Sequence, residues 1–140
     1  YNQLQNKLVM FFTGIKRDTN QVLSKSTTEG LKEIQELAYE AKDALKGQNF
    51  DKYGLLLNKH WESKKKRGGM TNPEIDKYYD LGLKNGALGG KLIGAGGGGF
   101  LLFYTSNREK LIKNMPLRYQ PFDWDFEGSK IIYNDDKNIC

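Results

Sequence analysis

The sequence is poor in cysteine and histidine and has no long apolar run. Its single cysteine, Cys140, has no second cysteine to pair with, so no disulfide can form within the chain. The longest uncharged, mostly apolar stretch spans residues 92–104, which is shorter than the ~18 residues of a membrane helix and is interrupted by glycines. One histidine and one cysteine also give no ligand set of the zinc type. These shortages exclude a disulfide scaffold and a membrane-spanning helix, and we expect no metal site.

What the sequence does contain fits one globular domain. The 140 residues are 38% hydrophobic and 28% charged, close to the size and composition of a domain that builds its own core. The net charge of +5 is compatible with an anionic partner, either a nucleic acid or a phosphorylated metabolite. The chain begins at Tyr1 without an initiator methionine or a signal pattern. We therefore expect it to be a piece of a longer cytoplasmic protein.

Apolar periodicity predicts strands at both ends of the chain with helices between them. A buried strand is expected at residues 8–12, and later strands at 91–93, 100–104, 118–122 and 130–133. Helices are expected from a capping box at Ser26 and Glu29 to Gly47, from about Asn49 to Gly68, from Asn72 to about Gly86, and over 107–115. This order favours an α+β fold in which a mostly antiparallel sheet carries helices on one face. Residues 135–140 are expected to form a frayed tail.

The most informative stretch is Gly-Ala-Gly-Gly-Gly-Gly at residues 94–99. Each glycine inside an element costs about 0.5–1 kcal/mol relative to alanine. A flexible linker would have polar flanks, whereas this stretch joins two apolar segments. A tight turn or bulge needs only one or two glycines. We therefore expect the backbone to approach another group closely, either a phosphate held by N–H groups or a neighbouring phosphate-binding segment.

Two nucleotide-binding motifs do not fit this stretch. The spacing Gly94-x-Gly96-x-x-Gly99 matches the dinucleotide fingerprint, but that fingerprint opens a helix and residues 100–104 predict a strand. A P-loop needs a hydroxyl residue after its Gly-Lys pair, and here Leu92 follows Lys91. Neither motif is therefore assigned.

An RNA-recognition domain is a second possibility for an α+β sheet of this kind. Phe100 and Phe103 imitate the second half of its aromatic motif, while Gly96 and Gly98 stand where the first half needs a basic and an aromatic residue. We expect the two phenylalanines to belong to the core, because base stacking requires exposed rings. A non-catalytic binding module for RNA or another anionic partner stays open as the alternative.

Several motifs in order resemble the GHMP small-molecule kinases. Residues 91–100, Lys-Leu-Ile-Gly-Ala-Gly-Gly-Gly-Gly-Phe, are similar to the third motif of that family. Residues 12–17, Phe-Thr-Gly-Ile-Lys-Arg, are similar to its Tyr-Thr-Gly-x-x-Arg strand end, and residues 56–65 to its Leu-Leu-x-x-x-Trp-x-x-Lys-Lys helix. The resemblance is greatest to D-glycero-D-manno-heptose 7-phosphate kinases and the kinase part of fucokinases, and it covers residues 4–133.

The resemblance implies that residues 1–134 form the ferredoxin-like C-terminal domain of a sugar kinase. The N-terminal ATP-binding domain, with its main phosphate loop, is absent from this chain. The full-length enzyme would use ATP with Mg²⁺ to phosphorylate a heptose phosphate or a related sugar. The implied partners are the sugar phosphate, ATP and the protein's own N-terminal domain, whereas a nucleic acid or a membrane is not expected. The chain alone would be inactive, and its exposed docking face could lead to self-association.

The same resemblance assigns roles to individual residues but places no catalytic residue in this chain. It implies that the loop at 94–99 packs against the phosphate loop of the missing domain. Candidates for the substrate side are Thr13, Arg17, Lys64, Lys65 and Lys91. Each has an ordinary alternative: Arg17 and Lys91 can be solvated surface cations, and lysines at the end of a helix are favoured by its dipole.

Overall fold

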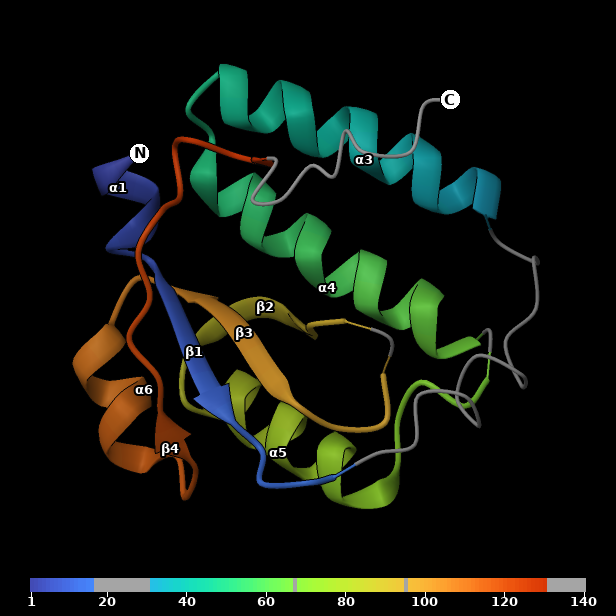
Figure 1. Cartoon of the computed structure of the whole chain (residues 1–140), viewed down its shortest axis with the longest axis vertical. Coiled ribbons are helices and arrows are strands. Elements are labelled where there is room, and N and C mark those ends of the chain that lie inside the picture. Colours follow the sequence, from blue (N-terminus) through green and yellow to red (C-terminus); the bar gives the residue numbers. More distant parts are fainter. Residues whose placement is uncertain (17–30, 67, 95, 131–140) are drawn as a thin grey trace, which may run out of the picture.

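The computed structural model describes residues 1–16, 31–66, 68–94 and 96–130 of the chain. The four strands among them form one antiparallel sheet in the order β2-β3-β1-β4 (Figure 1). The α+β, ferredoxin-like class is therefore confirmed. No helix in the described ranges could cross a membrane. The elements are α1 (Asn2–Gln5), β1 (Leu8–Phe12), α3 (Leu31–Lys46), α4 (Phe50–Lys66), α5 (Pro73–Lys84), β2 (Ala87–Leu92), β3 (Phe100–Thr105), α6 (Arg108–Asn114) and β4 (Arg118–Tyr119).

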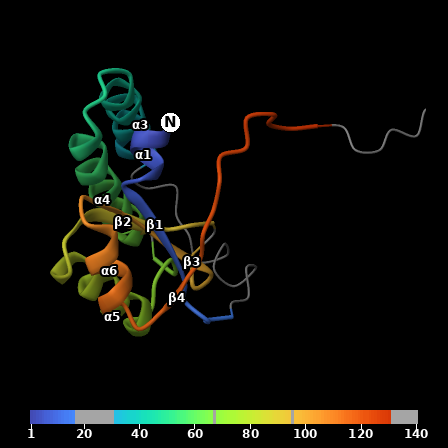
Figure 2. The same ribbon diagram turned by 90° about the vertical axis from the view of Figure 1, so that its left-hand side faces the viewer.

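The main core lies on one face of the sheet. Val9 pairs with Phe103 and Phe11 with Leu101 across β1 and β3, and all four side chains are fully buried. Because side chains alternate along a strand, these four share one face. Against them pack Trp61 of α4, Ile75 and Tyr79 of α5, and Leu111 of α6; α5 and α6 lie together on one side of the strands in Figure 2. Helix α4 also contacts the opposite face, where its Leu57 packs with Leu8 and Tyr104. This packing positions α4 beside the end of the sheet that carries the glycine segment.

Helix α4 runs alongside β2 at very close range because glycines face each other. A Cβ on Gly89 would lie 2.1 Å from the carbonyl oxygen of Gly54, and a Cβ on Gly54 would lie 2.4 Å from the Tyr104 ring. The Tyr79 hydroxyl is 2.7 Å from Asn58 Oδ1 of α4 and 3.1 Å from the carbonyl of Gly90 in β2. Helix and strand are thereby held together by backbone contact and by one buried hydroxyl.

The helix caps confirm the boundaries expected for two helices. The side-chain oxygen of Asn72 accepts hydrogen bonds from the amides of Glu74 and Ile75, with Pro73 in the first turn of α5. Asn107 caps α6 in the same way through the amide of Lys110. The capping box expected at Ser26 and Glu29 lies outside the described residues.

Two strand boundaries differ from those expected. Strand β2 begins at Ala87 instead of residue 91, because Gly89 and Gly90 leave the space that α4 and the Phe103 side chain occupy. Strand β4 is limited to Arg118–Tyr119 instead of 118–122. Its last hydrogen bond to β1 runs from Gln120 N to Met10 O, and Pro121 follows directly. Lys130 is not in a strand, and the remainder of the strand expected at 130–133 and of the tail lies outside the described residues.

Replacing Gly54 by alanine tests the contact between α4 and the sheet. Alanine usually stabilises a helix interior by about 0.5–1 kcal/mol. Here the added methyl would overlap the fully buried Tyr104 ring, so we expect a net loss of about 1–3 kcal/mol of unfolding free energy in urea titrations. Leu55→Ala is the control, since this neighbour is 52% exposed and should change stability by only about 0.5 kcal/mol. A Gly54→Ala chain as stable as the wild type would contradict the packing described.

Candidate functional site

Glycines at 94 and 96–99 lie between β2 and β3, and most of them have an unusual backbone conformation. The ladder ends with the hydrogen bond from Ile93 N to Phe100 O, at 2.8 Å. Beyond it, four residues have φ values in the left-handed region, where side chains other than hydrogen are strained: Gly94 at 85°, Gly96 at 109°, Gly97 at 74° and Gly99 at 98°. We call residues 94–99 the glycine loop. Ala95 within it lies outside the described residues.

One side of the glycine loop is held by the end of β1. The amide and the hydroxyl of Thr13 both donate to the carbonyl of Gly99, at 2.9 and 2.8 Å. The same hydroxyl accepts from the amide of Ile15 at 3.3 Å. A Cβ on Gly98 would lie 2.4 Å from the carbonyl oxygen of Ile15, so this position also requires glycine. Thr13, a predicted substrate-side residue, thus has its buried hydroxyl engaged in fixing the loop.

The other side is held by the connection between α4 and α5. The amide of Gly97 donates to the carbonyl of Met70 at 2.9 Å, and a Cβ on Gly96 would lie 2.8 Å from Met70 Cα. The Asn72 side chain, already the cap of α5, also reaches the Gly97 carbonyl at 3.5 Å. Sequence reasoning missed Met70 and Ile15. Met70 directly follows the Gly68-Gly69 pair, where the second helix is predicted to end, and this pair was the available signal for it.

The two predicted lysines of the basic block point to different neighbours. Lys64 Nζ donates to the carbonyl of Gly94 at 2.6 Å, so its charge lies at the start of the glycine loop. Lys65 Nζ forms an ion pair with Glu62 at 2.8 Å and lies 5.8 Å from the centre of the Tyr79 ring. Only Lys64 is therefore brought to the loop.

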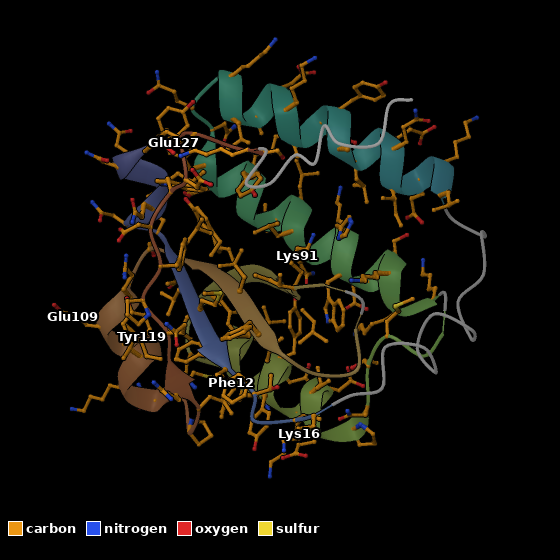
Figure 3. The ribbon with its side chains drawn as sticks, viewed as in Figure 1. Phe12, Lys16, Lys91, Glu109, Tyr119 and Glu127 are labelled. Atoms are coloured by element: carbon orange, nitrogen blue, oxygen red, sulfur yellow. The ribbon has the colours of Figure 1, made fainter. Side chains whose placement is uncertain are left out.

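Lys91 projects from β2 beside the same loop. It pairs with Leu102 of β3, on the face opposite to the core residues Leu92 and Leu101. Figure 3 places it between α4 and the sheet. The residue is half-buried, and burial lowers the pKa of its ammonium group. Within the described ranges it makes no ion pair and no hydrogen bond.

Apolar side chains at the strand ends next to the loop are partly exposed. Phe12 and Ile93 are each 38% exposed, and the Phe12 ring lies 5.2 Å from that of half-buried Phe100. Phe103, by contrast, is fully buried, with its ring against the position where Gly82 lacks a side chain. It is thus unavailable for base stacking, as an RNA platform would require.

Arg17, the single histidine His60 and a possible metal site remain to be described. Arg17 lies outside the described residues. His60 is half-buried on α4. Among the side chains that the structure describes, no three of His, Cys, Asp or Glu gather in a group that could hold a metal ion.

Comparison with known proteins points to kinases. The family described as GHMP kinases C terminal matches residues 41–120, more than half of the chain. The chain is 31% identical to the D-glycero-alpha-D-manno-heptose 7-phosphate kinase of Campylobacter jejuni, in an alignment that covers 92% of this chain and 41% of that protein. It is 30% identical to the bifunctional fucokinase/GDP-fucose pyrophosphorylase of Arabidopsis thaliana, covering 78% of this chain and 11% of that protein. The chain thus spans about two fifths or less of these curated relatives.

Several solved structures of similar fold are named as kinases. The mevalonate kinase of Methanococcus jannaschii is 30% identical with a TM-score of 0.61, covering 81% of this chain and 37% of that one. A putative sugar kinase from Campylobacter jejuni is 30% identical with a TM-score of 0.57, covering 85% and 36%. The L. major mevalonate kinase in complex with R-mevalonate has a higher TM-score of 0.68 at 21% identity, over 78% and 38%, and so shows a shared fold.

The Thr13 hydroxyl offers a test of how the loop is held. Thr13→Val keeps the shape of the side chain but removes the donor to Gly99 and the acceptor for Ile15. We expect it to lower the unfolding free energy by about 1–3 kcal/mol, because buried polar groups lose their partner. Thr13→Ser keeps the hydroxyl and should recover most of that loss in the same urea titrations. Equal stabilities for the valine and serine variants would show that the hydroxyl does not hold the loop.

Proposed function

We propose that this chain, which belongs to the GHMP kinase family as its C-terminal domain, forms one side of the active site of an ATP-dependent sugar kinase. The full-length protein would transfer the γ-phosphate of ATP to a hydroxyl of D-glycero-D-manno-heptose 7-phosphate or a related sugar. The name of the heptose phosphate kinase and those of the fucokinases support an acceptor of the sugar class. Proteins named as mevalonate kinases have a similar fold, so the fold alone does not select the acceptor.

The observation that carries this proposal is the position and the conformation of the glycine loop. Contacts with Thr13 and Met70 fix its backbone on two sides. Gly94 is exposed, and Gly97 and Gly99 are partly exposed, so backbone without side chains is available on the remaining side. Such backbone can approach a phosphate or a phosphate-binding segment more closely than any chain with side chains.

The partly exposed Phe12 and Ile93 support docking of the rest of the protein at this end of the sheet. We propose that the N-terminal part of the full-length protein covers these side chains and brings its own phosphate loop to the glycine loop. The active site would then lie between the two parts. Residues of this chain would position the reactants and exclude water, while the catalytic base would come from the other part.

The transfer itself requires little covalent participation by the protein. The acceptor hydroxyl oxygen forms a bond to the γ-phosphorus, the bond from that phosphorus to the β–γ bridging oxygen breaks, and ADP leaves. The hydroxyl proton passes to a base outside this chain. Catalysis depends on alignment and on stabilising the charge of the moving phosphoryl group. A fixed glycine loop and nearby ammonium groups can contribute to both.

In this proposal Mg²⁺ is held mainly by groups outside this chain. The described side chains provide no cluster of carboxylates or other ligands for it. In nucleotide enzymes Mg²⁺ is bound largely by substrate phosphates with one or two carboxylates, and we propose that it enters with ATP. No step of the mechanism above is assigned to a metal ligand of this chain.

A kinase assay of the full-length protein tests the proposal. With ATP and a panel of sugar phosphates that includes the heptose 7-phosphate, we expect ADP formation that depends on the acceptor. The chain alone should show none, because half of the positioning apparatus is missing. A full-length protein that converts no sugar or sugar phosphate in the panel would overturn the proposed function.

The variant Gly98→Ala tests whether kinase activity depends on the position of the glycine loop. Gly98→Ala places a methyl 2.4 Å from the Ile15 carbonyl oxygen and should lower kcat/KM by about 10- to 100-fold through displacement of the loop. Gly47→Ala adds the same methyl at the end of α3, where the nearest atom is at 3.3 Å, and should retain wild-type activity. If Gly98→Ala is folded and fully active, the loop does not have the role proposed.

A further inference from the structure

Lys91 occupies a sheltered position on the loop side of the molecule. Gly89, two residues earlier on the same face of β2, contacts Gly54 and Asn58 of α4. Further along, Lys64 of α4 reaches the carbonyl of Gly94. The helix and the strand therefore run in the same direction, with Lys91 between these two contacts (Figure 3). Lys91 thus lies three residues before the glycine loop, on the face of β2 that α4 covers.

The charge of Lys91 has no counter-ion among the residues that the structure describes. The other half-buried lysines that the structure describes have partners: Lys7 pairs with Asp51, Lys65 pairs with Glu62, and Lys64 donates to the carbonyl of Gly94. Lys91 has no such partner in the described ranges, and burial alone lowers its pKa, without a contribution from any acidic group. Partial burial of a cation without a counter-ion is unfavourable. An anion supplied from outside the chain would remove that cost.

We propose that Lys91 binds a phosphate group of a reactant at the entrance of the glycine loop, beside the charge of Lys64. This inference rests on the proposed function, which supplies two sources of phosphate, the acceptor sugar phosphate and the nucleotide. The ammonium group donates to the phosphate oxygens in charge-assisted hydrogen bonds. Lys64, whose ammonium group donates to the carbonyl of Gly94, adds positive charge at the start of the same loop.

The competing explanation is a structural lysine whose methylene groups line α4 while its ammonium group reaches water. The two explanations differ in their effect on ligands. Loss of a phosphate contact weakens binding of the phosphate-bearing reactant and leaves the fold intact. Loss of a structural lysine changes stability and leaves the Michaelis constants as they were.

The test uses the full-length protein with Lys91→Gln, Lys91→Arg and, as a control, Lys113→Gln. Lys113 is an exposed lysine in the last turn of α6, which packs on the opposite, core face of the sheet. For Lys91→Gln we expect a rise of about 10- to 100-fold in one Michaelis constant, a smaller rise for Lys91→Arg, and none for Lys113→Gln. All three variants should melt within a few degrees of the wild type.

The assay identifies the source of the phosphate. If it is that of the acceptor, the KM of the sugar phosphate rises while that of the unphosphorylated sugar and of ATP stay constant. If it belongs to the nucleotide, the KM of ATP rises with either acceptor. A folded Lys91→Gln enzyme with both Michaelis constants unchanged would overturn the proposal.

A binding measurement separates failure of this inference from failure of the proposed function. Inorganic phosphate and pyrophosphate should raise the melting temperature of the wild-type full-length protein by mass action. The increase should be lost in Lys91→Gln and kept in Lys113→Gln. This comparison does not need turnover, so it decides the role of Lys91 even if the wild type converts no sugar. Equal increases in wild type and Lys91→Gln would contradict a phosphate contact.

Discussion

The structure depends on how the glycines at 94 and 96–99 are held in place. The glycine loop is held on one side by the Thr13 hydroxyl and amide and on the other by the Met70 carbonyl. Thr13 directly follows β1, and Met70 lies two residues before Asn72, the N-cap of α5. Strand β1 lies inside the sheet and α5 packs on its core face. The contacts that hold the loop are therefore anchored in the packed core of the domain.

Most of the regular structure could be predicted from the sequence because it follows local chemistry. Apolar periodicity placed the three long helices and β1, and asparagine caps marked the starts of α5 and α6. The start of β2 could not be predicted, because Gly89 and Gly90 are poor strand formers that are required only by the approach of α4 and Phe103. Strand β4 is also shorter than expected, and apolar periodicity gave no sign of where it ends. The short helix α1 was not expected from the sequence.

The sequence indicated the glycine loop as a candidate site but not the contacts that hold it. Its glycines were attributed to a partner domain, whereas Gly96 and Gly98 already meet backbone of this chain, at Met70 and Ile15. These contacts join segments far apart in sequence, which periodicity and motifs do not register. The same limit applies to the adjacent lysines of the basic block. Lys64 contacts the loop at Gly94, whereas Lys65 lies against the Tyr79 ring. Family motifs identify which residues matter, and the packing determines what each one can contact.

Amide hydrogen exchange of the full-length protein without nucleotide tests most directly whether the loop is fixed by its own domain. The amide of Gly97 donates to Met70 and that of Thr13 to Gly99. The account predicts that both amides exchange slowly before any ligand is added, with protection close to that of the neighbouring strand β3. If both exchange as fast as an unstructured peptide and become protected only when ATP binds, the loop is not preformed and the account is contradicted.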